Sequence, residues 1–372
     1  MQFPLMITET KISTVIAGST AWDSLDQLVT ELTRKDGKVF ILTDDNTSRL
    51  CLPVLLAKVQ GFQKAVMLNI SPGESGKNPE NAVSLWNALA SAEAGRNSLL
   101  INLGGGVVSD LGGFVASTYK RGIPFINIPT TLMAMADAAI GGKTAINLQS
   151  VKNIVGSFYL PEATFLCPEF LSTLNKSHLL SGLAEIFKIA LAADKPFWEY
   201  LNTLITGQLF TTPLNLPLWE ELIARSAMIK CKIVEADFFE KDSRAVLNFG
   251  HTIGHAIESL SFRDKQMPLT HGEAIAIGIL CESYLSMHQC GLEEKEFRRI
   301  TQLFISTFGD YGITDKDIPV ILGFLNQDKK IRDGIQYFTL ISSPGKAMIK
   351  QPCDRDQIIR SLEFYRNLIS KH

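Results

Sequence analysis

The stretch LLINLGGGVVSDLGGFVAS, residues 99–117, decides the fold that this sequence predicts. An apolar run ends in three consecutive glycines, and a second apolar run with helical spacing follows at once. A strand that turns on glycine into a helix is typical of a parallel α/β sheet, and such a turn lets backbone N–H groups approach an anion. The pattern favours a site for a dinucleotide pyrophosphate. A tight turn without a ligand is the alternative, because the spacing GxGxxG is absent.

Further short β-rich runs accompany this turn and alternate with helical stretches in the first part of the chain. The runs are KVFILTDD (38–45), KAVMLNI (64–70), SLLINLGGG (98–106), PFINIPTT (124–131) and ATFLCP (163–168). Alternation of this kind is typical of a parallel sheet whose strands are joined by crossover helices. The first part of the chain therefore predicts an α/β domain.

After about residue 175 the pattern changes to long stretches with helical apolar spacing. These stretches cover 178–193, 217–238, 245–260, 271–290 and 293–308, with short turns between them. One exception, IQYFTLISSPGKAMIKQ (335–351), indicates a hairpin around Ser-Pro-Gly. We therefore expect a second part that is built mainly from helices.

The composition is that of an ordinary globular protein. At 372 residues the chain is long enough for two domains, because single cores stop growing at roughly 250 to 300 residues. Charged residues make up 20% of the chain, and a net charge of −2 gives no basic footprint for a nucleic acid. No run approaches the ~18 apolar residues of a membrane span, and the start lacks the form of a signal peptide. We expect a cytoplasmic protein that binds neither nucleic acid nor membrane.

A second glycine-rich stretch, IPTTLMAMADAAIGGKTAINLQSVKN (128–153), combines apolar residues with isolated polar ones. The polar residues and glycines are Thr130, Thr131, Asp137, Gly141, Gly142, Lys143, Lys152 and Asn153. A solvated loop would be less apolar, and a plain core would not contain two lysines and an aspartate. Lysines on a glycine-rich backbone indicate ligands for an anion.

The stretch NFGHTIGHAIESLSFRDKQMPLTHGE, residues 248–273, holds three of the six histidines. His251 and His255 are four residues apart and share one face if the stretch is helical. A catalytic zinc site needs three N or O ligands and an open position. Candidates for the third ligand are His271, Glu185 and Glu240, and the spacing does not choose among them. Histidines that only pack are the alternative.

Ten separated motifs of this sequence resemble those of the 3-dehydroquinate synthase family, which belongs to the sugar phosphate cyclases. In chain order they are TDDN (43–46), PGESGK (72–77), GGGVVSDLGGFVAS (104–117), YKRG (119–122), IPTTLMAMADAAIGGKTAIN (128–147), KNIVGSFYLP (152–161), GLAEIFK (182–188), NFGHTIGHAIE (248–258), HGEA (271–274) and DKK (328–330). The resemblance extends from about residue 38 to 335, and so many motifs in one order make it specific.

The resemblance implies a Rossmann-like NAD-binding α/β domain over residues 1–174 and an all-α metal- and substrate-binding domain over residues 175–372, in a homodimer. The implied activity is that of a carbon–oxygen lyase of the shikimate pathway. It converts a phosphorylated sugar acid, 3-deoxy-D-arabino-heptulosonate 7-phosphate, to 3-dehydroquinate and phosphate. NAD oxidises the substrate transiently, and zinc or cobalt acts as a Lewis acid.

Two related enzyme classes are the alternatives. Another sugar phosphate cyclase would also use NAD and a metal, but it would not need a full set of carboxylate-binding residues. A metal-dependent NAD alcohol or glycerol dehydrogenase would release NADH, and its metal ligands usually include an aspartate. The presence of four residues together favours a dehydroquinate synthase; they are Lys230, Arg244, Asn248 and His255.

Matched positions imply the site residues. The metal ligands are Glu185, His251 and His271, whereas His255 faces the substrate. The NAD contacts are Asp44, Asn46, Glu74, Lys77, Gly105, Gly106, Val107, Asp110, Thr130, Thr131, Asp137, Lys143, Lys152, Phe170 and Thr173. The phosphate contacts are Lys143, Asn153, His255, Lys329 or Lys330, and Arg121 from across the dimer. Lys230 and Arg244 hold the carboxylate, and the contacts to hydroxyls or water are Lys188, Glu240 and Asn248.

Two positions depart from the family pattern. Ala138 stands where the family commonly has serine, and His178 stands where an acid often lies beside the cofactor. These departures concern individual hydrogen bonds to NAD and not the reaction. We expect His178, His288 and His372 to have surface or packing roles.

Overall fold

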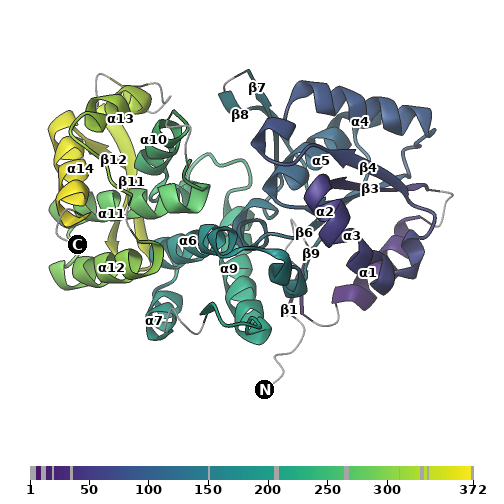
Figure 1. Ribbon diagram of the computed structural model, residues 1–372, viewed down its shortest axis with the longest axis horizontal. Helices are drawn as coiled ribbons and strands as arrows, with labels where there is room; N and C mark the ends of the chain where they lie inside the picture. The colour runs from purple at the N-terminus through teal and green to yellow at the C-terminus, as the bar shows by residue number, and fades with distance from the viewer. Residues whose placement is uncertain are drawn as a thin grey trace. The chain divides into compact units, whose positions relative to one another are not determined.

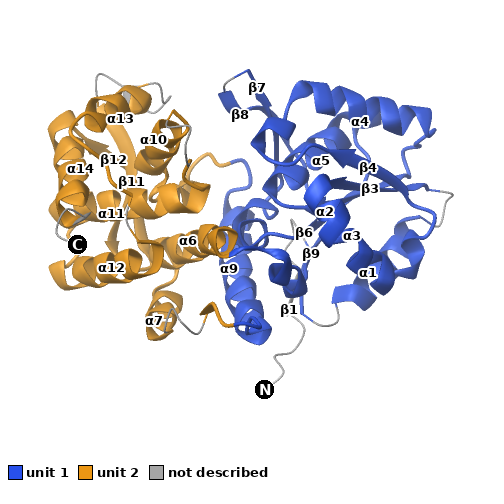
Figure 2. Cartoon of the chain, viewed as in Figure 1, with its two compact units in different colours: residues 1–175, 212–239 blue, residues 176–211, 240–372 orange. Residues whose placement is uncertain are grey.

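The structure is a computed structural model, and the residues that it describes form two compact units (Figure 2). The described residues are 6–9, 14–18, 21–33, 37–149, 151–204, 209–263, 268–309, 311–326, 331–332 and 335–369. Within these limits, unit 1 comprises residues 1–175 and 212–239, and unit 2 comprises residues 176–211 and 240–372. Residues 212–239 thus belong to unit 1, although the expected division at 174/175 groups them with the second domain. That division stays a prediction.

A seven-stranded sheet forms the centre of unit 1 (Figure 1). Its order is β1-β2-β9-β6-β5-β3-β4, with β1 Met6–Glu9, β2 Thr14–Ala17, β3 Val39–Asp44, β4 Val66–Ile70, β5 Leu99–Gly104, β6 Phe125–Pro129 and β9 Ala163–Leu166. All neighbouring strands pair in parallel except β1 and β2. Every residue of β5 and β6 is buried, as expected for strands in the middle of a parallel sheet. The predicted parallel sheet is confirmed.

Helices and a hairpin accompany this sheet (Figure 1). The helices are α1 Ala21–Leu32, α2 Asp45–Leu50, α3 Leu52–Lys58, α4 Pro79–Ser91, α5 Gly106–Thr118 and α9 Leu216–Ala236, and the hairpin strands are β7 Lys143–Leu148 and β8 Val151–Phe158. Helix α5 packs against β5, and a Cβ atom on Gly112 would overlap the side-chain oxygen of Asn102. Glycine at this position therefore lets the helix approach the strand closely.

Unit 2 is rich in helices and also contains a small antiparallel sheet (Figure 1). The helices are α6 Lys176–Ala193, α7 Lys195–Thr203, α10 His251–Ser261, α11 His271–Gln289, α12 Glu294–Phe308, α13 Asp317–Leu325 and α14 Arg355–Ile369. The sheet consists of β10 Ile331–Arg332, β11 Ile335–Ser343 and β12 Lys346–Cys353. The hairpin expected at 335–351 is thus present as β11 and β12. Among the described helices, none has the length and apolarity that crossing a bilayer requires.

The helix predicted over 245–260 is interrupted. Ser243–Asn248 form the short 3-10 helix η6, and α10 begins only at His251. Gly250 lies between them with a φ of +80°, a left-handed conformation that glycine adopts readily. The apolar spacing continues through this break, so the periodicity does not reveal it.

Three glycines bring α10 and its N-cap residue into direct backbone contact with α11. A Cβ atom on Gly278 of α11 would overlap the carbonyl oxygen of Gly250 and lie 2.7 Å from the nitrogen of Gly254. A Cβ atom on Gly254 would lie 3.1 Å from the carbonyl oxygen of Ala274. Because backbone atoms cannot yield as the end of a flexible side chain can, the two helices pack this closely only without side chains at these positions.

We predict that Gly278→Ala destabilises the protein by about 1 to 3 kcal/mol, because the added methyl group forces α10 and α11 apart. The free energy of unfolding in urea measures this effect. Gly323→Ala is the matched control, since Gly323 is an exposed residue of α13 with open space around it. The control should be stabilised by about 0.5 to 1 kcal/mol, because alanine favours the helix. Equal effects of the two substitutions would contradict this account of the packing.

Candidate functional site

The glycine turn joins β5 to α5 at the carboxyl edge of the sheet in unit 1. Gly105 is the N-cap residue of α5, and no side chain caps the first N–H groups of this helix. A Cβ atom on Gly105 would lie 3.0 Å from the Cγ2 atom of Thr131, which follows the neighbouring strand β6. The backbone of Thr130 donates a hydrogen bond to the carbonyl oxygen of Gly104 at 3.0 Å. The start of α5 therefore offers N–H groups to an anion beside the two threonines.

Some of the residues expected to contact NAD also have structural partners. Asp44 ends β3, and its Oδ1 atom accepts a hydrogen bond from the backbone of Thr47 at 2.8 Å, which caps α2. Phe170 is buried and packs edge-on against Trp22, with 5.8 Å between the ring centroids. The hydroxyl of Thr173 donates to the carbonyl oxygen of Phe170 at 2.7 Å. These residues thus help to form the edge of the sheet.

Lys77 connects α5 to the segment that follows β4. Its Nζ atom lies 2.9 Å from Asp110 of α5 and 3.2 Å from Glu74, and the side chain is 4% exposed. Burial alone would lower the pKa of Lys77, but the two carboxylates outweigh it and raise this pKa above its ordinary value. Lys77 is therefore a buried cation that is held in its charged form.

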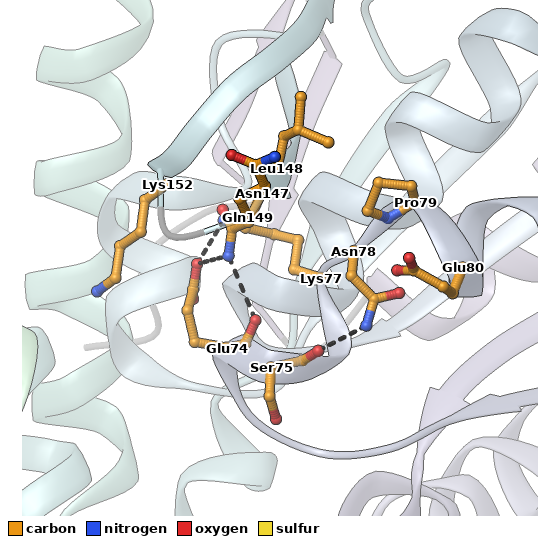
Figure 3. Close-up of a pocket in the computed structure, with 10 residues that line it drawn as sticks. All are labelled: Glu74, Ser75, Lys77, Asn78, Pro79, Glu80, Asn147, Leu148, Gln149 and Lys152. Carbon is orange, nitrogen blue, oxygen red and sulfur yellow. Dashed lines mark hydrogen bonds and ion pairs between the residues drawn. The ribbon is translucent and has the colours of Figure 1, made fainter.

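A pocket of about 470 Å³ opens beside this ion-pair cluster (Figure 3). Its lining residues come from the segment around Glu74 and from the β7–β8 hairpin; they are Glu74, Ser75, Lys77, Asn78, Pro79, Glu80, Asn147, Leu148, Gln149 and Lys152. Asn147 donates a hydrogen bond to Oε1 of Glu74 at 2.8 Å, which joins the two sides of the pocket. Three of the expected NAD residues thus line one pocket: Glu74, Lys77 and Lys152.

Lys230 of α9 makes an ion pair with Asp137. Its Nζ atom lies 2.7 Å from Oδ1 of Asp137 and also donates to the backbone carbonyl oxygen of the same residue. Lys230 is 5% exposed, so its charge is buried, whereas the side chain of Asp137 is 21% exposed. The family resemblance implied a substrate contact for Lys230 and an NAD contact for Asp137, and the structure brings the two side chains together.

In unit 2, three helices bring a carboxylate and two imidazoles to one point. Glu185 lies on α6, and His251 and His271 are the first residues of α10 and α11. Oε1 of Glu185 lies 3.3 Å from Nε2 of His271 and 3.7 Å from Nε2 of His251. Glu185 is 1% exposed, and neither of its oxygens accepts a hydrogen bond of good geometry from a described residue. Lys188 provides a buried counter-charge at 2.6 Å from Oε2.

The opposite ring nitrogens of the two histidines have acceptors of their own. Nδ1 of His251 lies 3.2 Å from the carbonyl oxygen of Phe249, and Nδ1 of His271 lies 3.3 Å from Oε2 of Glu258. Both partners only accept, so each Nδ1 carries a proton and donates it. Each Nε2 is thereby directed toward Glu185. Histidine ligands of metal ions commonly have this arrangement, in which an acceptor holds the far nitrogen.

The charged groups around Glu185 shift the pKa values of the two imidazoles in opposite directions. Burial would raise the pKa of Glu185, but Lys188 and the histidines outweigh it and hold this pKa well below its ordinary value. Burial and Lys188 lower the pKa of His251. Burial would also lower the pKa of His271, but its contacts with Glu185 and Glu258 raise it to about 9. Without a metal, a proton therefore sits on His271 beside Glu185, and a metal ion would have to displace it.

His255 lies close to the same point, so the geometry is compatible with two sets of three ligands. Its ring centroid is 5.2 Å from that of His251 and 5.6 Å from that of His271. One nitrogen of each of the three histidines lies within 4.8 Å of the others. The i, i+4 pairing of His251 and His255 on one helix is thus present. The alternative sets are His251, His255 and His271, or Glu185, His251 and His271.

Several other expected site residues have unusual backbone or burial. Arg121, Asn153 and Glu240 have φ values of +68°, +53° and +53°, a region that residues other than glycine seldom adopt. Such strain clusters at functional sites in proteins. Arg244 of η6 is 2% exposed although it carries a full charge, and Asn248 ends the same short helix.

The expected site residues divide between the two units. Unit 1 contains the NAD set together with Arg121, Lys143, Asn153 and Lys230, and unit 2 contains the metal set together with Lys188, Glu240, Arg244, Asn248 and His255. Lys329, Lys330 and His372 lie outside the described residues. His178 is exposed near the start of α6. The sequence analysis did not identify Glu258 as the partner of His271. Its one indication in the sequence is its position on the same helix, seven residues after His251.

Comparisons with known proteins identify one family over most of the chain. The family model for the 3-dehydroquinate synthase N-terminal region matches residues 67–181, and the model for the C-terminal region matches residues 182–331. A 3-dehydroquinate synthase from Parabacteroides distasonis is 41% identical over 332 residues, which cover 89% of this chain and 92% of that protein. Another from Symbiobacterium thermophilum is 34% identical over 359 residues, which cover 95% and 97%.

Solved structures of sugar phosphate cyclases share the fold. A 2-deoxy-scyllo-inosose synthase complexed with carbaglucose-6-phosphate, NAD⁺ and Co²⁺ has a TM-score of 0.80 at 24% identity, covering 95% of this chain and 96% of that one. A 2-epi-5-epi-valiolone synthase from Streptomyces hygroscopicus with NAD⁺ and Zn²⁺ has a TM-score of 0.79 at 24% identity, covering 100% of both chains. Because both family models match in order and relatives of one name align over most of their length, this chain belongs to the 3-dehydroquinate synthase family of enzymes.

Proposed function

We propose that the protein is a 3-dehydroquinate synthase, a carbon–oxygen lyase that converts 3-deoxy-D-arabino-heptulosonate 7-phosphate to 3-dehydroquinate and phosphate in the cytoplasm. The family match from residue 67 to 331 supports this proposal. The main structural support is the convergence of Glu185, His251 and His271 in unit 2. A buried carboxylate whose Oε1 atom faces two oriented imidazole nitrogens fits a divalent metal ion.

We assign the metal ligands to Glu185, His251 and His271, and not to His255. The Nδ1 atoms of His251 and His271 are both bound to acceptors, which orients their Nε2 atoms toward the buried carboxylate. A bound zinc or cobalt ion would act as a Lewis acid on a substrate hydroxyl. His255 is exposed, which leaves its ring accessible to a substrate. Lys188 offsets the negative charge that Glu185 would otherwise carry alone in the interior.

NAD would bind unit 1 at the carboxyl edge of the sheet. The uncapped N-terminus of α5 suits the pyrophosphate, because its free N–H groups and the helix dipole both favour an anion. NAD would oxidise a substrate hydroxyl and return the hydride within one turnover, so no NADH accumulates. Lys77, held in its charged form by Asp110 and Glu74, supplies a fixed positive group beside the expected cofactor residues.

The substrate carries a phosphate and a carboxylate, and the chain offers cations for both. Lys143 and Asn153 on the β7–β8 hairpin are exposed and suit the phosphate. The assignment of Lys230 and Arg244 to the carboxylate rests on matched motif positions and on their burial as charged residues. With the phosphate of the substrate available to take up a proton, the protein would mainly supply positioning and electrostatic stabilisation.

A homodimer is part of this proposal. Large apolar side chains are exposed along the β7–β8 hairpin and beside it, a pattern typical of contact surfaces; they are Leu148, Val151, Ile154, Val155, Phe158 and Phe239. Arg121, with its left-handed backbone, would reach the phosphate site of the partner subunit.

The activity itself provides the first test. Purified protein supplied with the heptulosonate phosphate, NAD and zinc should release phosphate without net NADH, and a chelator should abolish the release. Glucose 6-phosphate, which lacks the carboxylate, should release none. Net NADH from a simple alcohol without phosphate release would instead indicate a dehydrogenase.

The ligand assignment predicts different outcomes for two substitutions. Glu185→Ala and the isosteric Glu185→Gln should lose bound zinc, and their activity should fall below about 1% of the wild-type value, because a ligand is removed. His255→Ala should retain zinc and lose activity through its substrate contact. Zinc per subunit, measured by atomic spectroscopy after dialysis, distinguishes the two. Equal loss of zinc in the Glu185 and His255 variants would favour the three-histidine set.

The position of Arg121 predicts that inactive subunits can complement one another. Arg121→Ala and Glu185→Gln homodimers should each be inactive. After mixing and subunit exchange, half of the dimers are mixed, and each mixed dimer has one intact site if Arg121 acts across the interface. The mixture should then regain about a quarter of the wild-type activity. No recovery, with mixed dimers verified by mass, would mean that Arg121 acts within its own subunit.

A further inference from the structure

Helix α10, which carries His251, begins without a cap from its own sequence. Its N-cap residue is Gly250, which has no side chain to accept a hydrogen bond from the first turn. A larger residue would not fit, because a Cβ atom at this position would overlap the side chain of Ile279 and lie 3.3 Å from the carbonyl oxygen of Ile275. The left-handed φ of +80° disfavours other residues as well. The acceptors for this helix start must therefore come from elsewhere.

Glu282 of the neighbouring helix α11 provides these acceptors. Its Oε2 atom accepts a hydrogen bond from the backbone of Gly250 at 2.6 Å, and its Oε1 atom accepts one from the backbone of Ile253 at 3.0 Å. A capping box normally satisfies the N–H groups of the N-cap and N3 positions with two side chains of the same helix. Here one carboxylate from another helix satisfies both. Its negative charge also lies at the positive end of α10, which is favourable.

This contact fixes the start of α10, where His251 and Thr252 lie between the two N–H groups. His251 is the first residue of α10, so Gly250 and Ile253 enclose it in the chain. Glu282 belongs to the same helix that begins with His271, and that helix is already in backbone contact with Gly250 and Gly254. Glu282 is fully buried, with an exposure of 0%, so solvent does not loosen the two hydrogen bonds.

We propose that Glu282 is a positioning residue of the metal site, which sets the place of His251 relative to His271 by capping α10 from α11. This inference rests on the proposed function, because it assumes that the two histidines bind one metal ion. Glu282 is not one of the proposed metal ligands. It acts through the backbone of the helix start, as groups behind a metal ligand generally do.

The test is the metal affinity of Glu282→Gln in the folded, metal-free protein. The amide keeps the shape of the side chain but has one acceptor oxygen, so one of the two backbone N–H groups loses its partner. We expect zinc and cobalt to bind about tenfold to a hundredfold more weakly in a competition assay with a chelator. The visible absorption spectrum of the cobalt-loaded variant should also change, because it reports the geometry of the ligands.

Asp194→Ala is the matched control. Asp194 caps α7 in the same unit by accepting a hydrogen bond from the backbone of Phe197 at 2.7 Å, and α7 carries none of the proposed ligands. A cap that serves only stability would lower the melting temperature without changing the metal affinity of the folded protein. The control should behave in this way, with metal affinity within about twofold of the wild-type value.

If Glu282→Gln does not fold, Glu282→Asp provides the same test, because its carboxylate is one methylene shorter and cannot reach both N–H groups. A folded Gln or Asp variant with wild-type metal affinity and cobalt spectrum overturns the positioning role and leaves the proposed function intact. A wild-type protein that binds neither zinc nor cobalt overturns the metal site itself, and with it this inference.

Discussion

Backbone contact between α10 and α11 is the constraint on which the proposed metal site depends. Gly250, Gly254 and Gly278 leave no room for a side chain, so the two helices lie as close as their main chains allow. His251 and His271 are the first residues of these helices and therefore face the same buried carboxylate. Close packing of helices, and not proximity in the sequence, thus brings the proposed ligands together.

Both units bury charge, and in each the charge is balanced locally. Lys77 lies between Asp110 and Glu74 in unit 1, and Lys188 lies against Glu185 in unit 2. Removing one partner of such a pair leaves an uncompensated charge in the interior, which is costly. Buried groups of this kind do not serve stability alone, because an apolar side chain would fill the same space at a lower cost. In both units these charged residues are among those that we propose to contact NAD, the metal or the substrate.

Local features of the sequence predicted the fold well, whereas contacts between helices could not be predicted from it. The strand, glycine turn and helix over 99–117 could be predicted because all three signals are adjacent in the chain. The break at Gly250 was missed, since apolar spacing does not report a left-handed φ. Spacing favoured the i, i+4 pair His251 and His255 and could not choose a further ligand, because Glu185 reaches the imidazoles from another helix. Glu282 gave no motif signal, and only its distance to the start of α10 shows its role.

The inclusion of α9 in unit 1 affects how this unit can form during synthesis. Residues 212–239 leave the ribosome only after the first segment of unit 2, residues 176–211, yet α9 packs on β1 and β2 and supplies Lys230 to Asp137. Trp219, Leu222 and Ile223 of α9 are completely buried. A nascent chain that ends before this helix must keep the matching apolar surface uncovered. Unit 1 is therefore completed only after a segment of unit 2 has been made, although all the described strands of its seven-stranded sheet precede that segment.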